Sequence, residues 1–218
     1  MLKFKLGDAI GFLQRINISF LNRGGIMDEM MDEMRIAGQY TVRDYEQLNL
    51  NEKEDWEKAI EIFKMRMKTR FINPIKEIEN KKYAGFAIMA ICCLLIETLK
   101  QFYEGNEESS ISKEAFKGFL AEDSLFATYF DHEEAKVFYE KIRCGILHQA
   151  KIKDSCLIRN NNTLMESIEG SDGLIIDARK FSNKLIEEFE AYIEKLKEKE
   201  DRELIYNFKR KMRFICGG

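Results

Sequence analysis

The sequence predicts an all-α fold: a helical bundle with an N-terminal helical extension and a small β-hairpin insertion near residues 155–168. Two observations support this expectation. Apolar side chains recur at helical spacing in several segments, and only one proline stands among the 218 residues. With 45% hydrophobic residues, the chain can bury one substantial core. We therefore expect one domain, in which residues 1–50 form the extension and pack on a bundle of residues 51–218.

The extension is expected to hold two amphipathic segments. Residues 7–21 carry apolar side chains on one side, and Gly24 and Gly25 end this first helix. Four methionines then follow at i, i+3, i+4 and i+7, namely Met27, Met30, Met31 and Met34. This methionine stripe either packs on the protein's own core or forms a face for a partner or a second copy, since methionine adapts to irregular surfaces.

Two longer helices should follow. Asn51 is the expected cap of a helix that runs to Arg70, and Pro74 should kink or restart it. The nearly solid apolar stretch of residues 83–102 predicts a buried central helix closed by Gly105.

The central helix is not expected to cross a membrane. Its apolar run, residues 83–96, is shorter than the roughly 20 residues that span a bilayer. We therefore expect a core helix and no membrane partner. Glu97 is the first acid after the run, and its place near the helix end favours a solvated side chain, or one paired with a lysine, over a catalytic role.

The second half of the chain combines a helical part with the predicted hairpin. Ser112 is the expected cap of a short helix, and the aromatic residues up to Phe130 should fill one end of the bundle. Base stacking is their alternative role, but no lysine or arginine lies between Gly118 and Phe130. Residues 156–159 and 163–166, separated by three asparagines, predict the β-hairpin.

Asp177 is the expected cap of a long final helix that ends near Lys199. A last segment, residues 204–214, carries a basic cluster, which is either a solvated helix end or a contact for a phosphate backbone: Lys209, Arg210, Lys211 and Arg213.

Composition narrows the function classes. A net charge of −3 argues against a general nucleic-acid coating protein, which is normally basic, although an enzyme with a small basic site remains compatible with it. The five cysteines form no CxxC pair and no cluster at metal spacing. The N-terminal residues lack the long apolar region of a signal peptide. We therefore expect no metal, no cofactor and a reducing, cytoplasmic location.

Residues 131–149 hold the candidate catalytic pair. Asp131 and Glu134 predict a capping box at the start of a helix, and Arg143 and His148 follow near its end beside an apolar stripe. Histidine can transfer protons near neutral pH, while arginine offers phosphate a permanent charge and a planar fork. The pair therefore suits metal-free RNA cleavage. Alternatively, His148 is a helix-terminal residue whose charge interacts with the last carbonyls.

An arginine followed after four to six residues by a histidine, late in an amphipathic helix, resembles the signature of the HEPN superfamily (higher eukaryotes and prokaryotes nucleotide-binding). Many of its members are metal-independent RNases. The resemblance covers residues 52–200 in layout and Arg143 and His148 in motif. It implies that these two residues are catalytic and that single-stranded RNA is the substrate. The neighbouring polar side chains are expected to bind that substrate, and they are Lys141, Gln149 and Lys151.

The resemblance also has two departures. Cys144 directly follows the arginine, where HEPN RNases usually carry a polar residue, and Ala150 replaces the tyrosine of a variant motif. A catalytically inactive HEPN-like module that binds a nucleotide or another protein is therefore the alternative function.

The motif's spacing predicts a homodimer. On a regular helix, five residues at about 100° each separate the two side chains by about 140°, so they should not converge within one chain. One histidine also cannot donate and accept a proton in the same concerted event. Two Arg143/His148 pairs meeting across a symmetric interface would solve both problems, as the resemblance also implies. It further implies a role in phage defence or as a toxin, with a protein partner such as an antitoxin.

Overall fold

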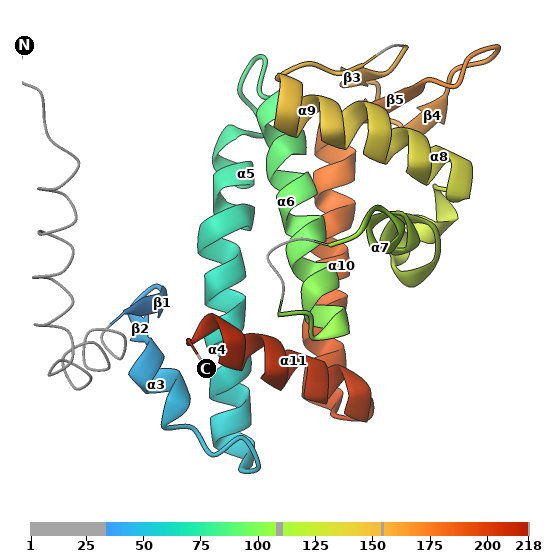
Figure 1. Cartoon of the computed structure of the whole chain (residues 1–218). Coiled ribbons are helices and arrows are strands. Elements are labelled where there is room, and N and C mark those ends of the chain that lie inside the picture. Colours follow the sequence, from blue (N-terminus) through green and yellow to red (C-terminus); the bar gives the residue numbers. More distant parts are fainter. Residues whose placement is uncertain (1–33, 108–110, 154, 218) are drawn as a thin grey trace, which may run out of the picture.

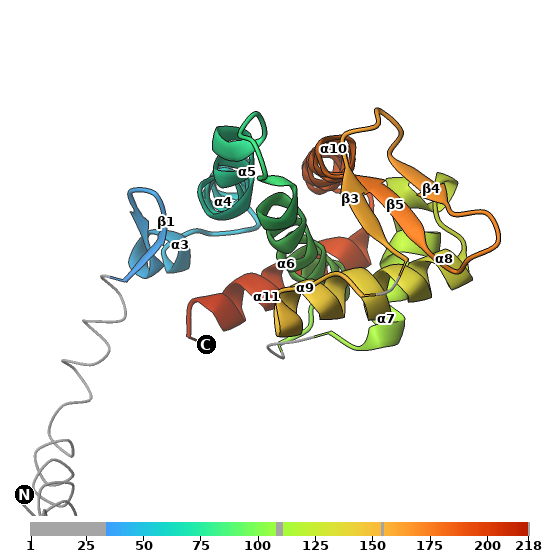
Figure 2. The same ribbon diagram turned by 90° about the horizontal axis from the view of Figure 1, so that it is seen from above.

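The computed structural model describes residues 34–107, 111–153 and 155–217, and these residues are mostly helical (Figure 1). This confirms the expected predominance of helix. Long helices run along one another through the centre, and another crosses them at one end (Figures 1 and 2): α4 (Lys53–Met67), α6 (Gly85–Glu104), α10 (Ala178–Glu198) and α11 (Arg202–Ile215).

Aromatic rings fill the space between these helices. Phe63 of α4 contacts four other rings, with a centroid distance of 4.4 Å to Phe102 of α6. The others are Phe189, Tyr192 and Phe208. All five are fully buried. The indole N–H of Trp56 donates to the carbonyl of Leu196 at 3.0 Å and so joins the start of α4 to the end of α10. Burial of these large side chains is a principal source of stability for the bundle.

The first arm of the bundle continues beyond α4. A π-helical turn (Lys68–Ile72) leads directly into α5 (Asn73–Ile78), with Pro74 in its first turn. The backbone therefore stays helical through Pro74, with a π-helical turn directly before α5 in place of the expected end at Arg70 and restart. The expected cap differs, because Glu52 rather than Asn51 stands at the N-cap of α4 and makes no side-chain hydrogen bond there.

The buried central helix is confirmed, but it begins at Gly85, and Tyr83 lies before it and is exposed. α6 ends at Gly105, whose φ of 61° is a left-handed conformation that glycine adopts without strain. Among the described residues, α6 alone has the length and hydropathy of a membrane span, with a mean hydropathy of 1.6 over a window that is half buried. A single such helix is weak evidence for a membrane span, because the core helix of a bundle has the same properties.

The aromatic segment fills one end of the bundle, as expected. Ser112 caps α7 (Lys113–Gly118) and accepts from the backbone N–H of Ala115. A π-helical turn (Phe119–Asp123) and a 3₁₀ turn (Leu125–Thr128) follow. Phe126, Phe130, Phe138 and Phe181 pack together there.

The predicted β-hairpin is wrong. β3 (Leu157–Arg159) and β4 (Met165–Ser167) both form, but each pairs with β5 (Leu174–Asp177), which lies between them. β3 is parallel to β5 and β4 is antiparallel to it. The apolar sequence of β5 explains this order, because Leu174 and Ile176 are buried and the chain places its most apolar strand at the centre of the sheet.

The N-terminal extension differs from the expected helices where the structure describes it. β1 (Arg35–Ala37) and β2 (Tyr40–Thr41) form a small antiparallel pair, followed by the short helix α3 (Val42–Glu46). Ile36 and Ala37 are buried, and β1 contacts α4, so this part does pack on the core. The helix expected at residues 7–21 and Met27, Met30 and Met31 lie outside the described residues. Met34 is exposed.

The C-terminal basic cluster is divided among different surroundings. Lys211 is buried, and the Arg210 Nε donates to Glu107 at 3.0 Å. Lys209 lies over the Trp56 ring, and Arg213 is exposed. The cluster is therefore neither a uniformly solvated helix end nor one continuous basic surface.

Candidate functional site

The candidate pair lies on a helical stretch in three parts. α8 (His132–Val137) begins with the expected capping box between Asp131 and Glu134. A π-helical turn (Phe138–Arg143) follows, and α9 (Cys144–Gln149) completes the stretch. The buried residues Phe138 and Ile142 hold one side of it against the core, so its other side carries the site.

A tight chain reversal fixes the end of α9. Ala150 has a φ of 49°, and the backbone N–H of Lys151 turns back to the carbonyl of Gly145 at 3.1 Å. A Cβ at position 145 would lie 2.2 Å from the carbonyl oxygen of Lys151. Only glycine allows the returning chain to come this close, so Gly145 helps to determine where His148 lies.

Glu97 of α6 holds the guanidinium of Arg143. The Nε and Nη2 atoms of Arg143 donate to the Glu97 Oε1 atom at 2.8 and 2.5 Å. Both side chains are only 13% exposed. Two hydrogen bonds from one planar group fix its orientation as well as its position. The pairing of Glu97 with an arginine corrects the expectation of a solvated or lysine-paired acid.

The charge of Glu97 keeps Arg143 firmly protonated. Burial by itself would lower the pKa of Arg143, but the hydrogen bonds and the negative charge of Glu97 outweigh burial and raise this pKa above its ordinary value. Arg143 is therefore a fixed cation in the site.

His148 contacts the third nitrogen of the same guanidinium. Its Nε2 atom lies 3.1 Å from the Arg143 Nη1 atom. Because an arginine N–H only donates, Nε2 accepts in this contact and the ring proton lies on Nδ1. The histidine itself is exposed to solvent. Arg143 thus links a largely buried carboxylate to an exposed imidazole.

This contact corrects the expectation that the two side chains cannot converge within one chain. The 140° separation concerns the directions in which the side chains leave the helix. Arginine is long enough to curve back along the helix surface, and Glu97 holds it in that conformation. The 140° separation therefore gives no reason for a dimer, and that expectation is wrong. The need for two proton-transferring groups remains.

Aromatic and sulfur groups surround the guanidinium. Its Cζ atom lies 5.2 Å from the centre of the Tyr139 ring, and Nη1 lies 4.0 Å from the Cys144 Sγ atom. Cys93 is fully buried, and this burial raises the pKa of its thiol well above the ordinary value. Cys93 is therefore a neutral packing residue, and Cys92 beside it is fully buried as well.

The expected substrate-binding residues are divided. Lys141 forms an ion pair with Asp172 at 2.6 Å and is only 16% exposed in its side chain, so it is engaged away from the pair. Gln149 and Lys151 are exposed at the end of α9, directly after His148. His132, the other histidine, contacts Glu122 at 2.9 Å on the surface. No group of three metal-binding side chains occurs within the described ranges.

Sequence reasoning missed Glu97 as a member of the site. The signal was present: Glu97 ends the long apolar run of α6, and an acid on a largely buried helix requires a cationic partner. Sequence alone could not say which cation provides it, because Arg143 lies 46 residues away along the chain.

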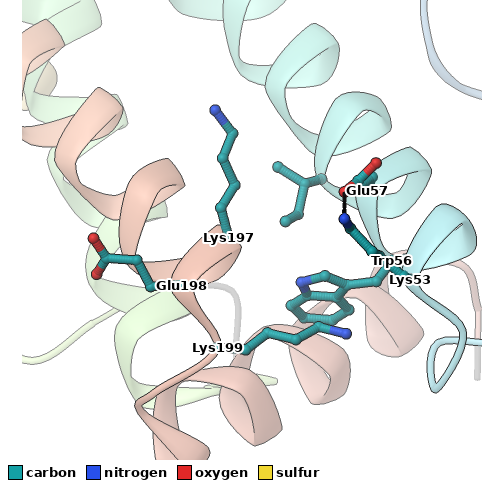
Figure 3. Close-up of a pocket in the computed structure, with 7 residues that line it drawn as sticks. Lys53, Trp56, Glu57, Lys197, Glu198 and Lys199 are labelled. Carbon is teal, nitrogen blue, oxygen red and sulfur yellow. Dashed lines mark ion pairs between the residues drawn. The ribbon is translucent and has the colours of Figure 1, made fainter.

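Two hollows of the described part lie away from this pair. One of about 570 Å³ lies between α3 and α11. Another, of about 480 Å³, lies between the start of α4 and the end of α10, where lysines surround the Trp56 ring (Figure 3). Lys53 pairs with Glu57 there, and Lys199 lies 4.8 Å from the centre of the indole. Neither hollow includes Arg143 or His148.

No family model, no curated protein and no solved structure matches this chain. A function is therefore inferred from the chemistry of the site.

Proposed function

We propose that the protein is a metal-independent endoribonuclease of HEPN type, which cuts single-stranded RNA at Arg143 and His148 and acts as a homodimer. The observation that carries this proposal is the 3.1 Å contact between the Arg143 Nη1 and His148 Nε2 atoms. A permanent cation, largely buried, and an exposed proton-transferring group lie side by side. These are the groups that RNA cleavage without a metal requires.

The proposed reaction is an internal displacement at phosphorus. His148 Nε2 takes the proton of a ribose 2′-hydroxyl, and the 2′-oxygen bonds to the adjacent phosphorus. The bond from phosphorus to the 5′-oxygen breaks, and that oxygen receives a proton. Arg143 binds the phosphate oxygens while negative charge develops on them. The products are a 2′,3′-cyclic phosphate and a 5′-hydroxyl end.

Glu97 prepares Arg143 for this role. It accepts from Nε and Nη2 and leaves Nη1 directed toward His148. A phosphate that enters the site can receive the Nη1 hydrogen bond and free the imidazole to act as a base. Glu97 is a positioning residue, because its carboxylate faces the guanidinium from the protein side.

A second copy would supply the second proton-transferring group. His148 can accept the 2′-hydroxyl proton, and the protonated His148 of a second copy can donate to the leaving oxygen. Leu94 supports such an interface, since it is 45% exposed on α6 one helical turn before Glu97. The proposed interface therefore includes this side of α6.

The test is to incubate the purified protein with mixed RNA in the presence of EDTA and to analyse the ends of the products. Cleavage that EDTA leaves unchanged, with cyclic phosphate and 5′-hydroxyl ends, is the expected result. Intact RNA with and without EDTA would exclude the nuclease.

A catalytically inactive HEPN-like module that binds a nucleotide or a protein is the second candidate. The ion pair with Glu97 favours it, because this acid neutralises Arg143 and leaves only 13% of the arginine side chain exposed. Cys144 after the arginine favours it as well. Binding of RNA or nucleotide without any cleavage would support this candidate.

A further inference from the structure

The helices α6 and α10 begin at the end of the molecule that also carries α9 (Figure 1). Basic side chains gather around these two helix starts. We call this group the basic end surface and define it by Lys81, Lys82, Arg159, Arg179 and Lys180, all of which are exposed. No carboxylate pairs with any of them in the part of the chain that the structure describes. Such a concentration of unpaired cations is unexpected in a chain of net charge −3.

Two acids that lie beside this surface are engaged in other contacts. Glu79 accepts from Lys76 at 3.0 Å, and only its backbone carbonyl contacts Arg179. Asp177 is buried and accepts from the backbone N–H groups of Asn162, Arg179 and Lys180. Both acids thus support the local fold. The positive charge of the surface stays available for an external anion.

Three adjoining hollows shape the surface. One of about 230 Å³ lies between the loop before α6 and β3, and it includes Lys81, Lys82, Arg159 and Arg179. This first hollow shares Arg179 with a second hollow of about 220 Å³. The first hollow also shares Tyr83 with a third hollow of about 410 Å³, which reaches Ile152 just beyond α9. Together they form a path from the start of α10 toward the end of the helix that carries His148.

Tyr83 stands in this path with its ring in solvent. The residue is 86% exposed, although tyrosine is usually at least half covered. Its backbone has a φ of 65°, a left-handed conformation that costs free energy in residues other than glycine. The Lys82 Nζ atom lies 4.9 Å from the centre of the ring. A strained, exposed aromatic ring beside cations is suited to stacking on an unpaired base.

We propose that the basic end surface binds single-stranded RNA: its cations contact successive phosphates, and Tyr83 stacks on a base. This inference rests on the proposed function, because it identifies how the substrate reaches Arg143 and His148. Unpaired bases are required for stacking on Tyr83, since a duplex keeps its bases within its own stack. The surface therefore favours single strands over duplex.

The experiment measures the anisotropy of a fluorescein-labelled, single-stranded 2′-O-methyl RNA of mixed sequence on titration with the full chain. The 2′-O-methyl groups remove the nucleophile, so binding is measured without cleavage. Tyr83→Ala should weaken binding by about fivefold to hundredfold, as loss of one stacked base does. Tyr83→Phe should bind like the wild type. The double reversal Lys81→Glu/Lys82→Glu should weaken binding further and reduce its salt dependence, because phosphate contacts are lost.

A matched control is Lys53→Glu/Lys58→Glu at the start of α4, at the opposite end of the molecule (Figure 1). It carries the same change of charge and should bind like the wild type. Equal weakening by both double reversals, or unchanged binding by Tyr83→Ala, would overturn the inference. So would equal affinity for a duplex of the same sequence. Cleavage of ordinary RNA is measured separately. If ordinary RNA is cut but Tyr83→Ala binds RNA like the wild type, this surface is rejected and the nuclease is retained. If Tyr83→Ala weakens binding but the wild type leaves ordinary RNA intact, the nuclease is rejected and this surface is retained.

Discussion

Arg143 contributes to two properties of the molecule at once. It neutralises the largely buried carboxylate of Glu97, and it contacts His148. The first contribution concerns stability and the second concerns the proposed chemistry. Because different atoms of one guanidinium make the two contacts, substitutions can separate them.

Arg143→Ala and His148→Ala should each reduce RNA cleavage by about a hundredfold or more. The double variant should be little worse than either single one, because the two residues act as a unit. Their stabilities should differ. Arg143→Ala leaves Glu97 without its partner and should cost about 1–3 kcal/mol, whereas His148 is exposed and its loss should shift the melting temperature only slightly. Initial rates and thermal melts measure the two effects.

The double variant Arg143→Ala/Glu97→Ala is the control that separates the effect on stability from the effect on cleavage. Removing the unpaired carboxylate should recover most of the lost stability and none of the cleavage. If both single alanine variants cut RNA at the wild-type rate, the site is not catalytic.

Cys144→Asn should preserve or raise cleavage, because it introduces the polar residue that the HEPN pattern usually has at this position. The asparagine side-chain oxygen would accept from Arg143, whose Nη1 atom now lies 4.0 Å from the Cys144 sulfur. Cys144→Ala is the matched control for loss of the thiol. kcat/KM is the measurement, and a tenfold fall in the asparagine variant alone would contradict the expectation.

At the scale of elements, the end of α9 depends on a close backbone approach. Gly145→Ala would place a Cβ 2.2 Å from the Lys151 carbonyl oxygen, so the returning chain must shift. We expect a loss of about 1–3 kcal/mol, in the range of overpacked sites, together with lower cleavage because His148 moves. In contrast, Gly118→Ala in α7 meets no atom closer than 3.6 Å. It should stabilise the protein by about 0.5–1 kcal/mol. Chemical denaturation of both variants tests the contrast, and equal effects would contradict it.

Helices and caps were more predictable than strand pairing. Ser112, Asp131 and Asp177 each cap a helix where the sequence indicated one, because capping depends on residues within one turn. The pairing of β3 and β4 with β5 is a nonlocal choice that depends on burying Leu174 and Ile176. The asparagines between β3 and β4 indicated a turn. They carried no information about β5, which follows both strands in the sequence but lies between them in the sheet.

The candidate site was predictable only where it depends on residues that lie close together in the sequence. Arg143 and His148 lie within one helical stretch, so their spacing was visible in the sequence. Their contact and the role of Glu97 were not, since both depend on how α6 packs beside α9. The exposed, strained Tyr83 gave no sequence signal at all, because positive φ in a tyrosine arises from the surrounding chain.

For the whole molecule, a single imidazole in the site, that of His148, requires a second copy if proton donation and acceptance are concerted. The expected state in solution is thus a homodimer with twice the chain mass of 25.7 kDa. Leu94→Glu places a charge on the exposed side of α6 beside Glu97 and should give a monomer with little cleavage. Leu125→Glu is the matched control, since Leu125 is similarly exposed, at 42% against 45%, and it should remain a dimer. Light scattering at micromolar concentration measures both. A wild-type mass of one chain at every concentration would remove the dimer and leave His148 without the second proton-transferring group that the proposed mechanism requires.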